Sequence, residues 1–337
     1  MTKQSEADTR TRIKETDSRL SIRHRWDHFL ARWGINRKGH RIEPGLYALG
    51  APSPNSPVFV TANYTLSFDA LRENLAGVDA WILVLNTRGI NVWCAAGKGT
   101  FGTTMLCYYI RETGLEKIVN HRKLILPQLG ATGVSAHEVK RRTGFSVEYG
   151  PIRAEDLQEY MKYGKADEKM RTVRFDIKDR AVLIPVEFVA SFVYMIAAGV
   201  GFFFVGGWLA SVAAASAFLA GTALFPLLLP WIPTRDFSSK GFILGGLVAV
   251  GFALAIFFTN TTSVWWMRTV DSVIYLLLIP PVTAYLALNF TGSTTFTSKS
   301  GVRREMYKYI PVMAWLFGIG LLVTVFDVVV KIARLWR

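Results

Sequence analysis

The stretch VFVTANYTLSFDALRENLAGVDAWILVLN, residues 58–86, decides the fold class of the first half of this chain. It opens and closes with short apolar runs, VFVTANY and AWILVLN, which are typical of buried strands. The residues between them, SFDALRENLAG, are predicted to be a helix, with Ser67 as a plausible N-cap and Gly77 at the C-cap. A strand, a helix and a strand in that order indicate two parallel strands with the helix packed across them.

The same alternation continues to Tyr163. KLILPQL and FSVEYG are further apolar runs, and TTMLCYYIRETG and SAHEVKRRTG are predicted helices between successive strands. Residues 45–163 are therefore predicted to form an α/β domain, a Rossmann-like parallel sheet with helices packed on it. Ligands of such sheets bind beyond the carboxyl ends of the strands. Those ends are residues 61–64, 86–89, 128–132 and 149–151.

The second half of the chain has a different composition. Residues 164–180 are highly charged and are predicted to be a linker, whereas residues 181–233 contain one charged side chain, Glu187. A single membrane span needs about 20 apolar residues, so this run is predicted to be two spans with a tight turn near Gly206 and Gly207. Three further spans are expected at 241–258, 270–288 and 309–330. Residues 181–337 are thus predicted to be an all-α transmembrane domain of about five helices.

The first 44 residues form a basic, polar tail with 11 Lys and Arg against 6 Asp and Glu. Residues 1–18 are expected to be disordered. In RLSIRHRWDHFLARWGI, Trp26, Phe29, Leu30 and Trp33 recur at helical spacing, which predicts an amphipathic helix. That helix could lie on an anionic membrane surface or pack on the soluble domain, and the pattern does not choose between these.

The net charge of +14 is better explained by a membrane than by nucleic acid, because some of the basic residues flank the apolar spans and cytoplasmic flanks of spans are basic. We expect a multi-pass protein of the cytoplasmic membrane that contacts membrane lipid and binds no nucleic acid. The α/β domain is expected on the cytoplasmic side.

The segment NTRGINVWCAAGKGTFGTT, residues 86–104, places one of two cysteines, Cys94, among small residues at a strand end. Its GKGTFG matches the dinucleotide pattern GxGxxG, but it does not follow the strand directly and no acidic residue closes the next strand. The Walker A loop is excluded because Lys98 is followed by Gly99. A bare Gly/Ala surface instead admits a large flat ligand, and a thiolate at its edge is a soft ligand for a central metal.

NVWCAAGK, residues 91–98, resembles the signature of the HgcA family, the membrane-bound corrinoid proteins of microbial mercury methylation. TANYTLSFDALR and LPQLGATGVSAHEVKRRTGFSVEYGPI are also similar to that family. The soluble domain further resembles the corrinoid domain of the acetyl-CoA-pathway corrinoid iron–sulfur proteins. The cysteine and the membrane part distinguish this chain from those relatives.

The resemblance implies that Cys94 is the catalytic residue and the axial metal ligand to the cobalt of a cobalamin-type corrinoid, with residues 91–98 as a cap helix. Methyl–cobalt(III) would transfer its methyl group to Hg(II), giving methylmercury. The methyl donor would come from a folate or related one-carbon pathway. Fourteen further residues are expected to bind the corrinoid: Thr61, Asn63, Asn91, Val92, Trp93, Ala95, Ala96, Gly97, Lys98, Gly99, Gln128, Gly130, Ala131 and Thr132.

Two cysteines are too few for an iron–sulfur cluster, so an external electron donor is required to reduce the cobalt. The resemblance implies a ferredoxin-like protein of HgcB type with two 4Fe–4S clusters. Two alternatives to mercury methylation stay open. One is a membrane-anchored methyl carrier of one-carbon metabolism, and the other is a nucleotide-binding membrane transporter or sensor.

Overall fold

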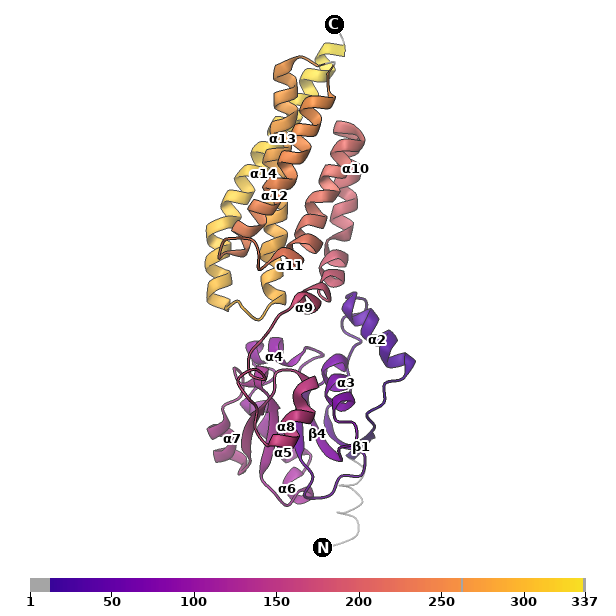
Figure 1. Cartoon of the computed structure of the whole chain (residues 1–337), viewed down its shortest axis with the longest axis vertical. Helices are drawn as coiled ribbons and strands as arrows, with labels where there is room; N and C mark the ends of the chain where they lie inside the picture. Colours follow the sequence, from indigo (N-terminus) through magenta and orange to yellow (C-terminus); the bar gives the residue numbers. More distant parts are fainter. Residues whose placement is uncertain (1–12, 262, 336–337) are drawn as a thin grey trace. The chain divides into compact units, whose positions relative to one another are not determined.

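The computed structural model describes residues 13–261 and 263–335. The chain divides after Arg174 into two compact units, within the predicted 164–180 linker, and each unit is described by itself. The first is an α/β domain and the second consists of apolar helices (Figure 1). The predicted fold class is confirmed.

A six-stranded sheet forms the centre of the α/β domain, in the order β1-β2-β4-β3-β5-β6. Strands β3, β4, β5 and β6 are parallel, as predicted, whereas β2 runs antiparallel to β4 and β1 runs parallel to β2. The sheet is therefore mixed. Its strands are β1 (Ile13–Thr16), β2 (Gly45–Leu49), β3 (Val58–Ala62), β4 (Ala80–Leu85), β5 (Lys123–Pro127) and β6 (Ser146–Gly150).

Helices pack on both faces of this sheet. Successive side chains of a strand point to opposite faces, so each central strand contributes to two hydrophobic cores. Along β4, Trp81, Leu83 and Leu85 join the core beneath one set of helices, and Ile82 and Val84 join the core beneath the other. The first set is α4 (Val92–Lys98), α5 (Thr103–Glu112), α6 (Leu115–Ile118) and α7 (Ala136–Thr143). The second set is α3 (Thr65–Asn74) and α8 (Leu157–Tyr163). The short 3₁₀ turn η2 (Ala154–Asp156) precedes α8.

The strand order creates a switch point between β3 and β5. The chain leaves β3 to reach β4 on one side, and then crosses over β3 to reach β5 on the other side. Ligands of open α/β sheets bind at such a point, outside the carboxyl ends of the strands. Helix α4, which carries Cys94, directly follows the loop after β4 and contacts β3.

The N-terminal segment corrects one prediction. Residues 13–16 were expected to be disordered, yet they form β1 and extend the sheet beside β2. Residues 1–12 of that expected disorder lie outside the described residues, and Asp17, which follows β1, accepts hydrogen bonds from Arg72. The predicted amphipathic helix is present as α2 (Ile22–Arg32), and it packs against α3.

Within its described residues, the second unit contains four stretches of helix that are long and apolar enough to cross a membrane: 177–228, 237–259, 265–293 and 299–333. Their elements are α9 (Ile177–Ala181), α10 (Ile184–Leu219), the π-helix η3 (Ala220–Leu224), α11 (Phe225–Leu228), α12 (Phe237–Thr259), α13 (Trp265–Asn289), η4 (Phe290–Ser293) and α14 (Lys299–Leu335).

Helix α10 is a hairpin of two arms. Its backbone leaves helical geometry at Gly206 (φ −135°, ψ 17°) and Gly207 (φ 70°, ψ −162°). A Cβ atom on Gly199 would lie 3.4 Å from Ser211 Oγ, although a straight helix would separate these positions by about 18 Å. The arms therefore lie side by side (Figure 1), with the turn where it was predicted. Counted by arms, five segments have the length of a span.

Candidate functional site at the carboxyl edge of the sheet

Cys94 lies in the first turn of α4, and the cap of that helix holds its backbone. The side-chain oxygen of Asn91 accepts a hydrogen bond from the Cys94 amide, at 2.9 Å. Such a cap satisfies one of the otherwise unpaired amides at a helix start. Asn91 was expected to help hold the corrinoid, and in the structure its observed contact is to the backbone of Cys94.

The two faces of α4 have different surroundings. Val92, Ala95 and Ala96 are buried in the core of the domain, so their side chains fix the helix to the sheet. Cys94 and Trp93 are half-buried, and Gly97 and Lys98 are exposed. Of the fifteen predicted site residues, α4 therefore presents an outer group (Trp93, Cys94, Gly97, Lys98) and hides an inner group (Val92, Ala95, Ala96).

The GKGTFG motif does not form a phosphate-binding loop between a strand and a helix. Gly97 and Lys98 belong to α4, Gly99 (φ 80°) ends it in the left-handed conformation, and Gly102 is the N-cap of α5. The dinucleotide motif requires its glycines at the turn from a strand into a helix. Apart from the chain neighbours of Gly97 and the backbone of α4 itself, no heavy atom lies within 4 Å of a Cβ placed on Gly97, so the outer surface of α4 is open there.

Asn63 holds the turn that leads from β4 into α4. Its Oδ1 accepts hydrogen bonds from the Thr87 amide (2.9 Å), the Thr87 hydroxyl (3.0 Å) and the Gly89 amide (3.0 Å). Its Nδ2 donates to the Ile42 carbonyl at 3.3 Å. Asn63 and Thr61 were both predicted to bind the cofactor, but each side chain is only 3% exposed, and Asn63 acts on the loop backbone.

The loop after β5 packs directly against α4. A Cβ on Gly133 would lie 2.9 Å from the Ala96 Cα, and one on Gly130 would lie 2.6 Å from the Phe101 ring. These two glycines thus allow a close approach of the two loops. Gly133 was not among the predicted residues, although it stands in the same glycine-rich run as Gly130.

The remaining predicted residues of this loop are accessible in part. Ala131 is half-buried and Thr132 is exposed. Gln128 begins the 3₁₀ turn η1 (Gln128–Gly130), and its Oε1 is buried without a hydrogen-bond partner in the described structure. Because buried polar atoms are normally paired, this oxygen is available to accept a hydrogen bond from a ligand.

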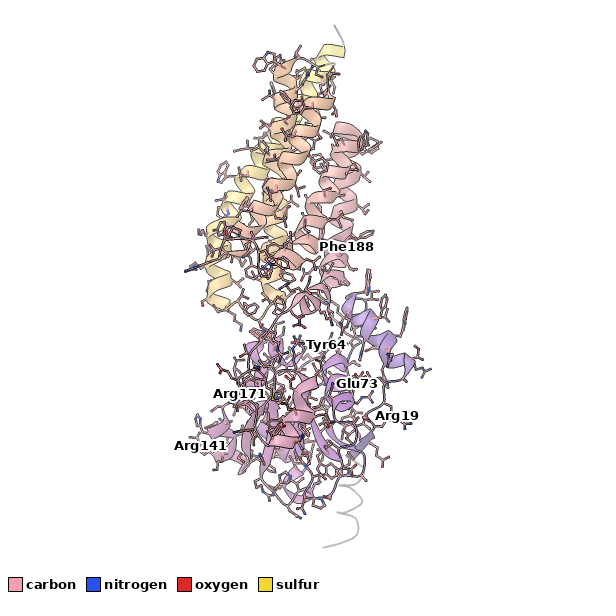
Figure 2. The ribbon with its side chains drawn as sticks, in the orientation of Figure 1. Arg19, Tyr64, Glu73, Arg141, Arg171 and Phe188 are labelled. Atoms are coloured by element: carbon pink, nitrogen blue, oxygen red, sulfur yellow. The ribbon has the colours of Figure 1, made fainter. Side chains whose placement is uncertain are left out.

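Tyr64 is a site residue that the sequence interpretation missed. It directly follows β3 and is labelled in Figure 2. Burial raises the pKa of Tyr64, the charges of Arg32 and Arg37 lower it, and Asp27 and Cys94 raise it further. The position of Tyr64 next to a predicted strand end was the available signal.

The N-terminal segment also borders this edge of the sheet. Arg41 pairs with Tyr64 in an isolated β-bridge, and a Cβ on Gly89 would lie 2.5 Å from the Arg41 Cγ. Among the residues that the structure describes, no group of three or more His, Cys, Asp or Glu side chains could hold a metal ion. Cys94 offers one soft ligand, at the margin of an open surface of small residues.

Residues 35–161 match the family model described as the CO dehydrogenase/acetyl-CoA synthase delta subunit. The chain is 38% identical over 114 residues to the acetyl-CoA decarbonylase/synthase complex subunit gamma of Archaeoglobus fulgidus, which covers 33% of this chain and 24% of that protein. It is 28% identical over 119 residues to the corrinoid/iron-sulfur protein large subunit of Moorella thermoacetica, covering 35% and 26%. The α/β domain is therefore related in sequence to parts of both proteins.

This relationship has clear bounds. It includes the strands β2 to β6 and α4, and it leaves out the apolar helices of the second unit. The chain spans about a quarter of the length of the curated relatives it matches. The relationship therefore bears on the α/β domain and on the site at its carboxyl edge.

Proposed function

We propose that the α/β domain binds a cobalamin-type corrinoid and that the chain is a membrane-anchored corrinoid methyltransferase. One observation carries the proposal: a half-exposed thiol, Cys94, stands at the switch-point edge of a domain that is related to a corrinoid/iron-sulfur protein. A parallel sheet offers its ligand site at this edge. The spans of the second unit would anchor the domain to the cytoplasmic membrane.

The residues at this edge fit a corrinoid in three respects. A thiolate is a soft ligand that suits a transition metal, and Cys94 is on the open side of α4. Gly97 leaves room above that side for a flat ring. The unpaired Gln128 Oε1 could accept a hydrogen bond from an amide at the rim of the macrocycle. Ala131 and Thr132 would complete the rim.

The residues of the chain would act by binding and orientation. The corrinoid, when bound, supplies a cobalt atom that carries a methyl group and gives it to an acceptor. Cys94 would hold the metal through its thiolate and would donate electron density to it. The Asn91 cap would hold the Cys94 backbone, and Trp93 would shield the thiolate from water. Asn63 would keep the preceding turn, and with it the start of α4, in place.

Hg(II) is the acceptor that we propose. One support is the segment NVWCAAGK, which resembles the mercury-methylation family. The other is that a soft, strongly donating thiolate on the metal would favour transfer of the methyl group to a soft electrophile. The chain has two cysteines, so a cluster with four cysteine ligands needs another protein. A ferredoxin-like protein with two 4Fe–4S clusters would supply electrons, and a folate-type donor would supply methyl groups.

A second candidate has its own support. The curated relatives include subunits of acetyl-CoA decarbonylase/synthase complexes, which favours a methyl carrier of one-carbon metabolism. Both candidates use the same corrinoid site, so they differ only in the acceptor. The GKGTFG geometry, which places two glycines at helix ends, gives no support to the nucleotide-binding transporter or sensor.

The full chain in nanodiscs, loaded with methylcobalamin, tests both candidates. We expect corrinoid absorption bands that co-purify with the protein, and methylmercury formation on addition of Hg(II) above the rate of free methylcobalamin. Bound corrinoid with methylmercury only at the uncatalysed rate would favour the methyl carrier. Failure to retain any corrinoid would exclude both. Cells with and without the gene, each carrying the ferredoxin-like partner, provide the matched measurement in vivo.

A further inference from the structure

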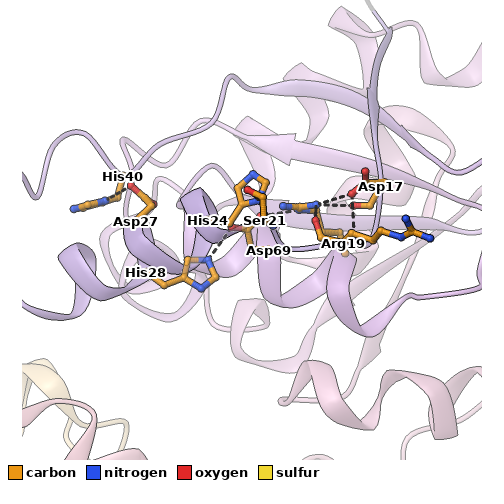
Figure 3. Close-up of polar contacts among 9 residues, drawn as sticks. Asp17, Arg19, Ser21, His24, Asp27, His28, His40 and Asp69 are labelled. Atoms are coloured by element: carbon orange, nitrogen blue, oxygen red, sulfur yellow. Dashed lines mark hydrogen bonds and ion pairs between the residues drawn. The ribbon is translucent and has the colours of Figure 1, made fainter.

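Helix α2 turns its polar side toward the protein. His28 Nε2 lies 2.7 Å from Asp69 Oδ2 on α3, and Asp27 Oδ1 lies 2.8 Å from His40 Nδ1 (Figure 3). Asp69 and His40 are 1% and 3% exposed. Charge-assisted hydrogen bonds to buried partners are strong and directional, so they fix which side of α2 faces the domain.

The segment that enters α2 is also tied to the domain. Arg72 Nε donates to Asp69 Oδ1 at 2.7 Å, and its Nη1 donates to the carbonyls of Asp17 (2.7 Å) and Arg19 (3.0 Å). Arg72 is itself buried. The helix therefore has a fixed start and a fixed inner side.

The outer side of α2 is apolar. Ile22, Trp26 and Phe29 are 80%, 61% and 44% exposed, and no residue of α2 is buried. Together with Trp33 they recur at the spacing of one helix face, which we call the α2 aromatic face. Trp26 and Phe29 stack with ring centroids 5.2 Å apart, and Phe29 and Trp33 are 5.7 Å apart. A helix with its polar side inward and its apolar side outward needs an apolar cover.

Basic side chains flank the α2 aromatic face. Arg23, Arg25 and Arg32 are exposed on α2, and Arg37 and Lys38 are exposed just beyond it. The acidic residue within α2, Asp27, is paired with His40. The surface that covers the α2 aromatic face must therefore offer apolar groups and, beside them, negative charge. Tryptophan and arginine at the boundary of an anionic bilayer meet both conditions.

We propose that the α2 aromatic face lies on the anionic surface of the membrane that holds the chain, with Trp26 and Phe29 at the headgroup level. The residues between α8 and α10, 164–183, span at most about 70 Å when extended. A bilayer is therefore always within reach of α2, at a high effective concentration. Basic side chains beside such a surface strengthen the attraction to it. This proposal does not depend on the bound cofactor or on the acceptor.

Lipid contact at α2 can be measured in the full chain. An environment-sensitive fluorescent amino acid is placed at position 22, and nanodiscs contain spin-labelled lipid that quenches it only at short range. Tyr163 on α8 provides the matched control position, because it is 61% exposed and lies on another helix. We expect quenching of about twofold or more at position 22 with phosphatidylglycerol present, and little at position 163.

Charge reversal tests the basic flank. R23E/R25E should reduce the quenching at position 22 in discs with phosphatidylglycerol, and K117E/K140E, which reverses two exposed lysines on α6 and α7, should not. Circular dichroism and retention of the thermal midpoint show whether each variant is folded. Quenching at position 22 that is no stronger than at position 163 would overturn the proposal. Unchanged quenching in folded R23E/R25E would overturn the role of lipid charge.

Discussion

The two cysteines of the chain differ in their surroundings, and this difference allows a direct test of the proposed ligand. Cys94 is half-buried on α4, whereas Cys107 is 4% exposed inside α5, and burial raises the pKa of its thiol. Cys94→Ala removes the only soft donor on the open side of α4. We expect the cobalt absorption bands to shift and methyl transfer to fall to the background rate.

Cys107→Ala is the control for this substitution. It deletes a buried sulfur in the core, so we expect a loss of about 1–2 kcal/mol in the free energy of unfolding with an unchanged spectrum and rate. Wild-type bands and rate in Cys94→Ala, at equal abundance, would show that another group binds the metal.

Asn63 is predicted to control the position of Cys94 without touching the ligand. Asn63→Ala leaves the buried Thr87 amide and the half-buried Gly89 amide unpaired, which should cost about 2–3 kcal/mol of stability. Corrinoid affinity should fall more steeply than the stability alone explains, because the turn before α4 loses its anchor. Asn74→Ala, which removes a single side-chain bond to the Ala70 carbonyl, should lower stability slightly and leave corrinoid affinity unchanged. An equal loss of affinity in both variants would contradict the positioning role.

From the sequence, the position of the candidate site at the carboxyl edge of the sheet could be predicted, but the direction in which each side chain points could not. Asn91, Trp93 and Cys94 were predicted and are accessible in part or fully. Asn63 follows β3 as an equally plausible ligand residue, yet it points into the turn beneath α4. That orientation depends on the left-handed turn at Arg88 and Gly89 (φ 62° and 73°), and such a turn is formed by contacts that are distant in sequence.

Among the helices, the turn of α10 depends on Gly207. Its φ of 70° and ψ of −162° fall in a region that is essentially restricted to glycine. Gly207→Ala should therefore lower the free energy of unfolding of the membrane unit by about 1–3 kcal/mol, and with it the thermal midpoint. Gly201→Ala is the matched control, since Gly201 lies in the helical part of α10 and has no atom within 4 Å of an added Cβ. Equal thermal midpoints for the two variants in detergent would show that the hairpin turn tolerates a side chain.

Elements with a strong pattern were predictable, and weak ones were not. VFVTA and AWILVL are buried along their whole length, so hydrophobicity alone identifies β3 and β4 as strands. β1 has the sequence IKET and is mainly half-buried, which leaves no apolar run to detect. The two arms of α10 were separable because their combined length exceeds one bilayer and because two glycines adjoin at the midpoint.

The number of times that the α10 hairpin crosses the membrane determines which loops lie on the same side of it. If both arms of α10 cross the membrane, as we propose, the loop before α14 returns to the side of the α/β domain and the C-terminus lies on the opposite side. Reporter fusions after Lys299 and after Arg337 should therefore report opposite sides, with the Lys299 fusion on the cytoplasmic side. If the Lys299 fusion instead reported the non-cytoplasmic side, α10 would cross the membrane once.

The pairing of β1 with β2 has a practical consequence for shortened chains. The sequence suggests Gly45 as a natural start for the α/β domain, since the residues before it are polar. A chain that begins there would lose β1, and the backbone amides and carbonyls of β2 that pair with it would become a free sheet margin. Exposed edge strands pair with strands of other molecules, so we expect such a fragment to self-associate and precipitate. Its insolubility would then result from the loss of a four-residue strand and not from a defect in the hydrophobic core.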